Sequence, residues 1–310
     1  MSVASCLHLP IPAAFCDSYH ADTPTPSMRK LHLVAQQAQS AGFATLHKPT
    51  PVSRRALLKI HDKGYVDSIF TGKGDLADCA YGFWSETYRD GVLAICGGNL
   101  LAAKMALKNG IAANVGQGFH HAHPGHGAGY CTFNGLALVA AMNPNLKILV
   151  IDCDEHAGDG TAVFAKKLPN LFNFSICGSR FDCKEHDRSV VQFIKPRDVD
   201  AYRAAIFEAL AEAATTKPDL VIYQAGMDSH ENDPLGRACM TGEFLLERDE
   251  TIMSALALQL HIPFFFVLAG GYQEPMEDTL VPLHVATFEI ASRVNAEVKR
   301  QAHLPNGHRA

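Results

Sequence analysis

The sequence lacks the features of a membrane protein and of a nucleic-acid-binding protein. Even its apolar run 262–271 has about half of the roughly 18 to 20 residues that a membrane helix needs. The 310 residues carry 27 Lys and Arg against 32 Asp and Glu, a net charge of -5, and the basic residues form no cluster. Binding to a phosphate backbone depends on such clusters. We therefore expect neither a membrane nor a nucleic acid as a partner.

The nine cysteines follow no metal-binding or disulfide pattern. Structural zinc sites repeat the CxxC spacing, and small secreted domains are dense in cysteine. Residues 1–12 have no basic stretch before their apolar part, so no secretory signal is expected. The interpretation that fits is a soluble, cytoplasmic protein with reduced thiols.

No internal repeat, low-complexity tract or flexible linker divides the chain. We expect residues 1–310 to form a single domain with a sizeable core. From residue 90 onward, helical and strand-like patterns alternate. This alternation predicts an α/β fold with an open, mostly parallel sheet and helices on both of its faces.

Short apolar runs bounded by polar, Gly or Pro residues predict strands at 111–115, 147–152, 171–176, 220–224 and 262–268. Helical patterns cover 27–40, 92–107, 199–214, 243–260 and 279–298. Asp200 and Thr241 are the expected N-caps of the third and fourth helix. The fourth carries a charged run that we expect on its solvated face, namely Glu247, Arg248, Asp249 and Glu250.

Four of the predicted strands are followed by reactive residues. Ligands of open α/β sheets bind outside the carboxyl ends of the strands. The segments found there are His120-His121, Asp154-Glu155-His156, Gly226-Met227-Asp228 and Gly270-Gly271-Tyr272. A right-handed parallel arrangement brings all four to the same edge of the sheet. The active site is therefore predicted in these loops.

Asp154 and His156 lie two residues apart at the end of the strand 147–152. Side chains at positions i and i+2 of an extended segment share one face, so both can bind one cation. Asp228 completes three ligands and leaves a position for water. Zinc held in this way polarises a carbonyl and activates water near neutral pH. Iron(II) stays open as the metal used in the cell.

His120 and His121 form an adjacent imidazole pair, and imidazole is the commonest general acid or base. Each histidine needs an orienting carboxylate, and Asp152 and Asp159 are the nearest unassigned acids. Two glycines before Tyr272 let the backbone pass close to a ligand and aim the phenol at a developing oxyanion. These parts describe metal-assisted hydrolysis of an amide.

In their order along the chain, these motifs resemble the signatures of the zinc-dependent histone deacetylase superfamily, which includes bacterial deacetylase-like amidohydrolases. The matching segments are Gly118-Phe119-His120-His121-Ala122, Gly129-Tyr130-Cys131, 152–160, 226–228 with 233–236, and 270–272. The resemblance covers about residues 55–285. Residues 60–66 and 82–85 are most similar to the class IV branch.

The resemblance implies an arginase/deacetylase-like fold and a role for each matched residue. The implied zinc ligands are Asp154, His156 and Asp228. His121 paired with Asp159 would be the general base and acid, and His120 paired with Asp152 would stabilise charge. Tyr272 would polarise the acyl carbonyl.

The same resemblance implies a channel for acyl-lysine and a structural cation. Gly129, Tyr130 and Gly270 would line the channel, and a K⁺ ion would bind near Asp152 and Ser175. Ala157 departs from the family, which often has a second histidine there. No residue of 76–86 replaces the aspartate that several members use on the channel rim to grip the substrate backbone.

Several other residues have ordinary structural interpretations. His123 and His126 are expected as loop residues rather than metal ligands. Cys131 is expected as a small buried residue rather than a nucleophile, because thiol chemistry would duplicate that of the metal. Trp84 is expected to pack in the fold rather than to form a lip of the channel.

Three functions are compatible with this site. The leading prediction is a hydrolase that removes acetyl or other acyl groups from lysine side chains of proteins or peptides. The alternative is an amidohydrolase of small acetylated amines such as acetylpolyamines, which would need an acidic pocket for the distal amine. The third is an inactive module that binds acyl-lysine. Such a module would be expected to lack one of the metal ligands, one of the paired histidines or the tyrosine.

Overall fold

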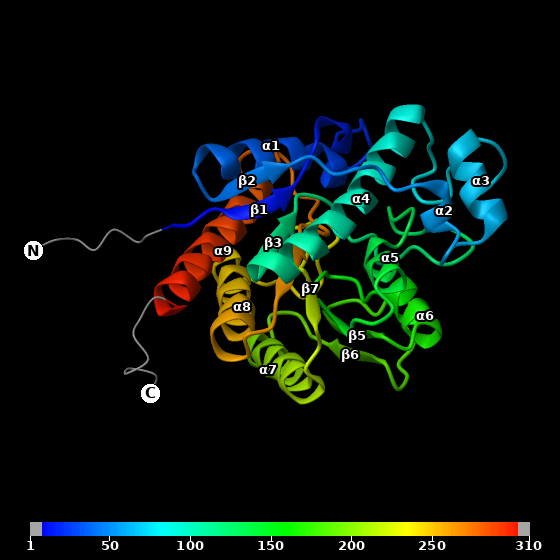
Figure 1. Cartoon of the computed structure of the whole chain (residues 1–310). Helices are drawn as coiled ribbons and strands as arrows, with labels where there is room; N and C mark the ends of the chain where they lie inside the picture. The colour runs from blue at the N-terminus through cyan, green and yellow to red at the C-terminus, as the bar shows by residue number, and fades with distance from the viewer. Residues whose placement is uncertain (1–7, 303–310) are drawn as a thin grey trace, which may run out of the picture.

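The structure, a computed structural model, describes residues 8–302. Within this range, eight parallel strands form one open sheet in the order β2-β1-β3-β8-β7-β4-β5-β6 (Figure 1). The strands are β1 (Ile11–Ala14), β2 (Ala44–His47), β3 (Ile111–Asn114), β4 (Ile148–Asp152), β5 (Leu171–Cys177), β6 (Ser189–Phe193), β7 (Leu220–Gln224) and β8 (Phe264–Val267). The predicted α/β fold is confirmed, with a sheet that is wholly parallel rather than mostly so.

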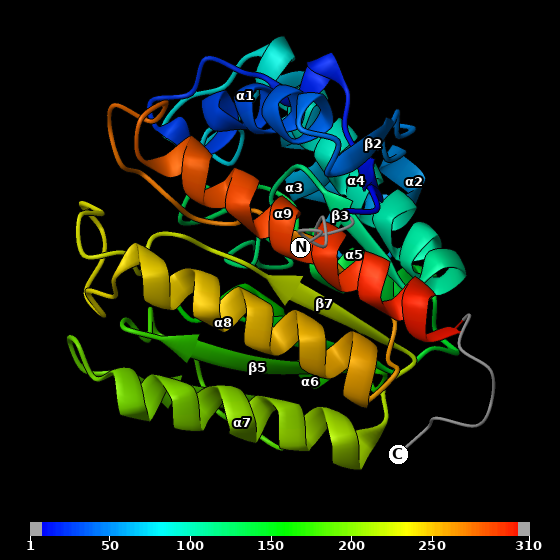
Figure 2. The ribbon, with the colours of Figure 1, turned by 90° about the vertical axis from the view of Figure 1, so that its left-hand side faces the viewer.

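Helices cover both faces of the sheet, as expected for parallel strands. They are α1 (Pro26–Ser40), α2 (Arg54–Leu57), α3 (Lys63–Thr71), α4 (Glu86–Asn109), α5 (Gly135–Met142), α6 (Asp159–Lys167), α7 (Val199–Thr216), α8 (Gly242–Ser254) and α9 (Leu280–Ala302). A row of α1, α9, α8 and α7 lies in front of the strands in Figure 2. On the other face α4, α5 and α6 follow one another in Figure 1.

Alternate residues of the central strands β3, β4, β7 and β8 enter two separate cores, as the two-residue period of a strand requires. In β4, Leu149 and Ile151 join the larger core, which includes α1, α8 and α9. Ile148 and Val150 join the core beneath α5 and α6. Such strands are buried on both faces, which explains why the sequence shows them as continuous apolar runs.

The boundaries of several elements differ from the prediction. Asp198 rather than Asp200 is the N-cap of α7, because its side chain accepts the N–H of Ala201 at 3.1 Å. Thr241 is confirmed as the N-cap of α8. The predicted helix 243–260 ends as an α-helix at Ser254 and continues as the π-helical segment η2 (Ala255–Gln259).

Parts of the sheet carried no clear sequence signal. The strands β1 and β2 have four residues each and extend the sheet beyond β3 by parallel pairing. The strand β6 pairs with β5 at the opposite edge. The strand β8 is equally short but is a continuous apolar run, whereas β2 and β6 include polar residues and show no such run.

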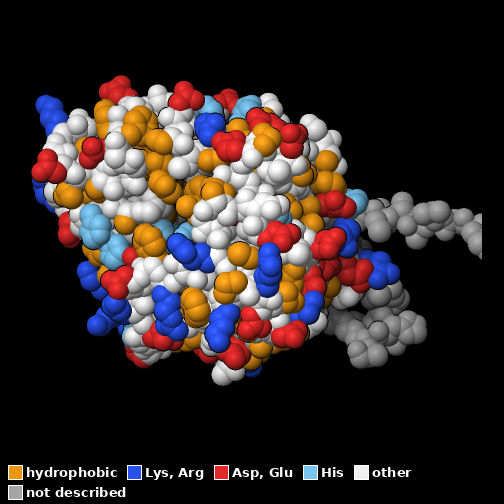
Figure 3. All heavy atoms as spheres, turned by 180° about the vertical axis from the view of Figure 1, so that it is seen from behind, with side chains coloured by type: hydrophobic (Ala, Val, Ile, Leu, Met, Phe, Trp, Pro, Cys, Tyr) orange, Lys and Arg blue, Asp and Glu red, His pale blue; other side chains and the backbone are white. Residues whose placement is uncertain are grey.

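The helix α4 is long and apolar enough to cross a membrane by length and composition. However, 72% of its apolar window is buried inside the fold, where it packs as a core helix. On the face seen in Figure 3, basic and acidic side chains of the described residues are interspersed. That face carries no extended basic stripe of the kind that follows a phosphate backbone.

The expectation of a solvated charged face on α8 is wrong for two of its four residues. Arg248 and Asp249 are fully buried. Their charges are paired with each other, and their remaining hydrogen-bonding groups have partners on other elements. Charged residues are buried only when they are satisfied in this way, which a run of charges in a sequence does not reveal.

Candidate active site

The four loops with reactive residues follow strands that are neighbours in the centre of the sheet. The order β3-β8-β7-β4 brings the carboxyl ends of these strands together. The loop after each of these strands carries some of the predicted site residues. The site therefore lies at the edge where parallel sheets bind ligands.

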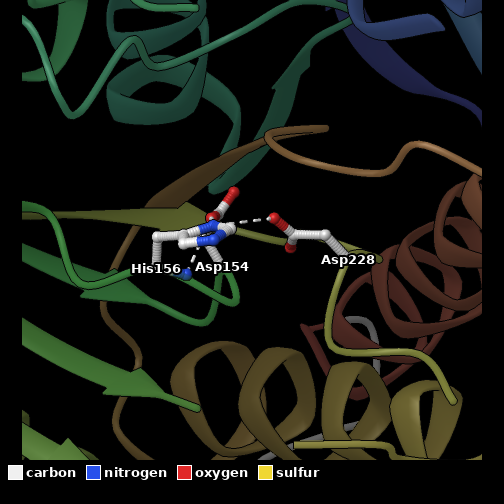
Figure 4. A group of neighbouring side chains, drawn as sticks. All are labelled: Asp154, His156 and Asp228. Carbon is white, nitrogen blue, oxygen red and sulfur yellow. Dashed lines mark hydrogen bonds and ion pairs between the residues drawn. The ribbon is translucent and has the colours of Figure 1, made fainter. Parts of the chain in front are cut away.

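Three side chains from two of these loops converge on one point (Figure 4). The ligand atoms of Asp154, His156 and Asp228 lie within 4.8 Å of one another. His156 Nδ1 is 3.5 Å from Asp154 Oδ1 and 3.5 Å from Asp228 Oδ2. Both aspartates are buried and the histidine is partly exposed. Two carboxylates and one imidazole form the set of oxygen and nitrogen donors that zinc accepts.

Backbone N–H groups hold the two carboxylates in place. Asp154 Oδ2 accepts the N–H of Gly270 at 2.7 Å, and Asp228 Oδ1 accepts the N–H of Glu155 at 2.9 Å. Asp228 Oδ2 is buried and has no hydrogen-bond partner. A buried carboxylate oxygen that accepts no hydrogen bond is costly in a protein interior, and a bound cation would satisfy it. The residues present therefore fit a divalent metal.

The two carboxylates also repel each other. Burial, followed by the charge of Asp154, raises the pKa of Asp228 above its ordinary value. A bound cation would attract both carboxylates and keep them ionised. The electrostatics of these three side chains thus favours the binding of a cation.

Each histidine of the adjacent pair contacts its own aspartate. His120 Nδ1 is 2.7 Å from Asp152 Oδ2, and His121 Nδ1 is 2.5 Å from Asp159 Oδ1. Asp152 ends β4, whereas Asp159 is the first residue of α6. In both histidines it is Nδ1 that contacts the aspartate, so Nε2 is the nitrogen on the opposite side of the ring. Asp152 Oδ1 also accepts the side-chain N–H of Gln224 at 3.0 Å.

The two imidazoles differ in basicity although their rings are 3.9 Å apart. Burial would lower the pKa of His120, but the charges of Asp152 and Asp154 outweigh it and raise the pKa to about 9. Burial and the neighbouring charge of His120 lower the pKa of His121 to about 4. The environment thus favours the cationic form of the His120 ring and the neutral form of the His121 ring.

A narrow cavity adjoins Asp154. Gly129, Tyr130 and Gly270, the residues predicted to line the substrate channel, are among the residues that line it. Its lining residues are Ser27, Gln117, Phe119, His120, Gly129, Tyr130, Cys131, Asp154, Gln224, Ala269, Gly270 and Tyr272. The rings of Tyr130 and Tyr272 are 5.7 Å apart, so both phenols flank this space. Burial raises the pKa of Tyr272, which keeps its hydroxyl protonated as a donor.

Two glycines of the site admit no side chain. A Cβ at Gly270 would lie 2.1 Å from Asp228 Oδ2, and a Cβ at Gly129 would lie 2.5 Å from His121 Cδ2. Gly129 also has a φ angle of +50°, which favours glycine. The backbone therefore passes directly against a ligand at one position and against an imidazole at the other.

Two residues next to the site, Phe181 and Lys30, were not identified from the sequence. The ring of Phe181 lies 4.0 Å from that of His121 and 5.6 Å from that of His156, and 40% of the residue is exposed. Lys30 is fully buried and donates to the carbonyls of Ala269 and Gly270 at 2.9 and 3.1 Å. Neither residue stands in a motif, and only the fold brings it to the site.

The ordinary interpretations of three other residues agree with the structure. Cys131 is buried, and burial raises the pKa of its thiol well above the ordinary value, which disfavours a nucleophilic thiolate. Trp84 packs against Gly72 and donates its indole N–H to Ile69. His123 lies outside the ligand set but bonds to Asp159.

The sequence also matches a known protein family over most of its length. A family model for the histone deacetylase domain matches residues 24–288. The chain belongs to the histone deacetylase family. It is a deacetylase-superfamily amidohydrolase with a candidate metal site formed by Asp154, His156 and Asp228.

Relatives in this family come from distant organisms. An uncharacterized protein of Picosynechococcus sp. is 32% identical over 265 residues, which are 82% of this chain and 88% of that protein. Histone deacetylase 2 of Arabidopsis thaliana is 29% identical over 251 residues, 73% of this chain and 63% of that protein, so the chain spans under two thirds of the plant enzyme. The crystal structure of acetylpolyamine aminohydrolase from Burkholderia pseudomallei has the same fold, with a TM-score of 0.75, 17% identity, and 93% of this chain and 98% of that chain covered.

Proposed function

We propose that this protein is a zinc-dependent deacylase that removes acetyl or other acyl groups from lysine side chains of proteins or peptides. The observation that carries the proposal is the convergence of Asp154, His156 and Asp228 beside two buried histidine–aspartate pairs. A divalent ion at three such ligands supplies Lewis-acid activation of water and of the scissile carbonyl. The ion is zinc in this proposal, and iron(II) is the alternative.

His121 acts as the general base and then as the general acid. Its Nδ1–H is directed to Asp159, so Nε2 carries the lone pair that takes a proton from the attacking water. The neutral ring that burial favours is the form that a base requires. The same nitrogen then returns the proton to the departing amine, as the histidine of a hydrolytic triad does.

His120 and Tyr272 stabilise the negative charge that develops as the amide carbonyl is attacked. His120 is held as a cation by Asp152, and it lies with Nε2 3.6 Å from Asp154 Oδ1. Tyr272 offers a protonated phenol beside the same cavity. Donors that are fixed before the reaction cost no reorganisation during it.

The walls of the cavity suit an extended methylene chain. Phe119, Tyr130 and Tyr272 line it with aromatic rings, and Gly129 contributes backbone without a side chain. The four methylene groups of a lysine side chain bury well against such rings, while a charged substrate end would stay in solvent. Gly129, Tyr130 and Gly270 are the proposed substrate contacts.

The remaining predictions complete the proposal. Ser175 is fully buried and pairs with Asp152 across β5 and β4, so a structural K⁺ is proposed beside them. Residues 60–66 and 82–85 favour the class IV branch of the family. A cytoplasmic location is proposed from the cysteines, which are scattered without the density of a disulfide scaffold.

A panel of acylated substrates tests the proposed function. Lysine peptides with acyl groups of increasing length and small acetylated amines are offered to chelated, zinc-restored and Tyr272→Phe enzyme. We expect zinc-dependent hydrolysis of the lysine peptides and a loss of kcat of roughly 10²-fold or more in the Tyr272→Phe enzyme. Equal turnover with and without metal would contradict the mechanism. Hydrolysis of the small amines alone would replace the protein-deacylase proposal by the acetylpolyamine alternative.

A further inference from the structure

Asp159, the acid that orients the proposed general base, is shared by a second histidine. Its Oδ1 contacts His121 Nδ1 at 2.5 Å, and its Oδ2 contacts His123 Nε2 at 2.7 Å. Burial alone would raise the pKa of Asp159, but the hydrogen bonds from both histidines lower it well below its ordinary value. An ionised carboxylate can only accept, so each imidazole donates an N–H to it.

The loop that carries His123 is fixed at its backbone. Asn134 donates its backbone N–H to His61 Nε2 at 3.1 Å, so the proton of His61 is on Nδ1, which donates to the carbonyl of His123 at 2.9 Å. The side chain of Asn134 donates to the carbonyls of His120 and Ala122 at 3.3 Å each. The position of His123 is thus set by contacts from outside its own loop.

His123 lies between the buried base and the solvent. Its side chain is 21% exposed, against 4% for His121. His126 stacks on it with ring centroids 4.7 Å apart and an interplanar angle of 6°, and His126 itself is exposed. Among the charged or titratable groups, Asp159 contacts the ring, His126 covers one of its faces, and His61 contacts its carbonyl.

We propose that His123 is a positioning residue for the deacylation reaction, because it locks the carboxylate of Asp159 in the orientation that fixes the His121 tautomer. The terminal torsion of an aspartate is soft, so a single hydrogen bond leaves the carboxylate free to rotate. A second donor on the other oxygen removes this freedom. His121 then keeps its proton on Nδ1 and its lone pair on Nε2. This inference rests on the proposed function of His121.

Three variants test the inference. His123→Leu removes the donor, and His123→Gln keeps an N–H that can reach Asp159 in place of Nε2–H. His126→Gln is the control, since His126 stacks on His123 but makes no bond to Asp159. We expect His123→Leu to lose kcat by about 10-fold or more with KM nearly unchanged, a typical cost of removing the group that orients a site residue. His123→Gln and His126→Gln should stay within about 3-fold of wild type.

Zinc affinity should be the same in all three variants, because neither His123 nor His126 is a metal ligand. The thermal midpoint should fall in His123→Leu, which loses a hydrogen bond to the carboxylate of Asp159, and should stay close to that of the wild type in His123→Gln and His126→Gln. An unchanged kcat in His123→Leu, or an equal loss in His123→Leu and His123→Gln, would overturn the inference.

NMR of protein with ¹⁵N-labelled histidine gives a readout that is independent of turnover. We expect two exchange-protected imidazole N–H signals from His121 and His123, and His123→Leu should remove one and shift the other. If the wild type hydrolysed no amide, the proposed function would fail, and the absence of that shift would separately overturn the shared carboxylate.

Discussion

Arg248 and Asp249 form an ion pair that is completely buried, with Nη2 and Nε of the arginine 2.8 and 3.0 Å from one carboxylate oxygen. Arg248 Nη1 also donates to the carbonyls of Gly226 and Cys153 at 2.8 and 3.2 Å. Gly226 lies two residues before Asp228, and Cys153 directly precedes Asp154. Through these hydrogen bonds the ion pair holds the backbone next to the candidate metal ligands Asp154 and Asp228.

Breaking this buried pair should destabilise the protein far more than breaking an exposed pair between α7 and α8. We expect Arg248→Met to lower the free energy of unfolding by about 3 to 5 kcal/mol, because Asp249 is left as an uncompensated buried charge. The matched control is Arg203→Met, which breaks a bidentate pair with Glu247 in which the side chains are 44% and 48% exposed. That change should cost less than about 1 kcal/mol. Urea unfolding measures both, and equal losses would contradict the prediction.

The sequence predicted the reactive loops because each follows an apolar strand, and parallel topology alone brings strand ends together. The candidate metal site could be predicted in this way, although His156 and Asp228 are 72 positions apart in the sequence. The environment of Arg248 could not be predicted, because the partners of the ion pair, Tyr223 and Thr287, lie on a strand and on another helix. Lys30 was hidden for the same reason, since its contacts are backbone carbonyls in a loop about 240 residues away. A local sequence pattern shows which residues share one face of a helix or strand. It does not show which distant residues will pair with a buried charge, because that depends on the complete fold.

Adding one methyl group at Gly270 should abolish metal binding without unfolding the protein. In Gly270→Ala the new Cβ would lie 2.1 Å from Asp228 Oδ2 and 2.7 Å from Asp154 Oδ2, so at least one ligand must move. We expect zinc affinity and activity to fall by roughly 100-fold or more. Gly64→Ala is the control, because no atom lies within 4 Å of its added Cβ. Competition with a chromophoric chelator measures affinity, and circular dichroism checks the fold. Wild-type affinity in Gly270→Ala would refute this geometry.

Removing the metal should lower the thermal stability of the wild type and leave an Asp228→Asn variant unaffected. The buried carboxylates of Asp154 and Asp228 face each other, and a cation that binds only the folded state relieves their repulsion. At a free zinc concentration of 100 times the dissociation constant, binding adds about 2.7 kcal/mol to the free energy of unfolding. Thermal melts with chelator and with restored zinc give this difference. A zinc-dependent shift of equal size in Asp228→Asn would mean that the ion binds elsewhere.

Acid should destabilise the fold partly through His61, away from the metal ligands. Burial lowers the pKa of His61 from 6.5 to about 4, and its Nε2 is needed as an acceptor for Asn134. Between pH 6.5 and 4 the unfolded chain binds a proton at this residue that the folded protein does not bind. The free energy of unfolding therefore falls as the pH falls through this window, by up to roughly 3 kcal/mol from this residue.

His61→Leu isolates this contribution. The variant loses stability at every pH, because two hydrogen bonds of His61 are removed, but its pH dependence between 6.5 and 4 should be weaker than that of the wild type. The expected reduction of the slope is up to about 1.4 kcal/mol per pH unit, the value for one proton. Urea unfolding is measured across this range with chelator present, so that release of metal does not contribute. A wild-type slope in His61→Leu would show that the proton is taken up at other residues, because only a group whose pKa differs between the folded and unfolded states can make stability depend on pH.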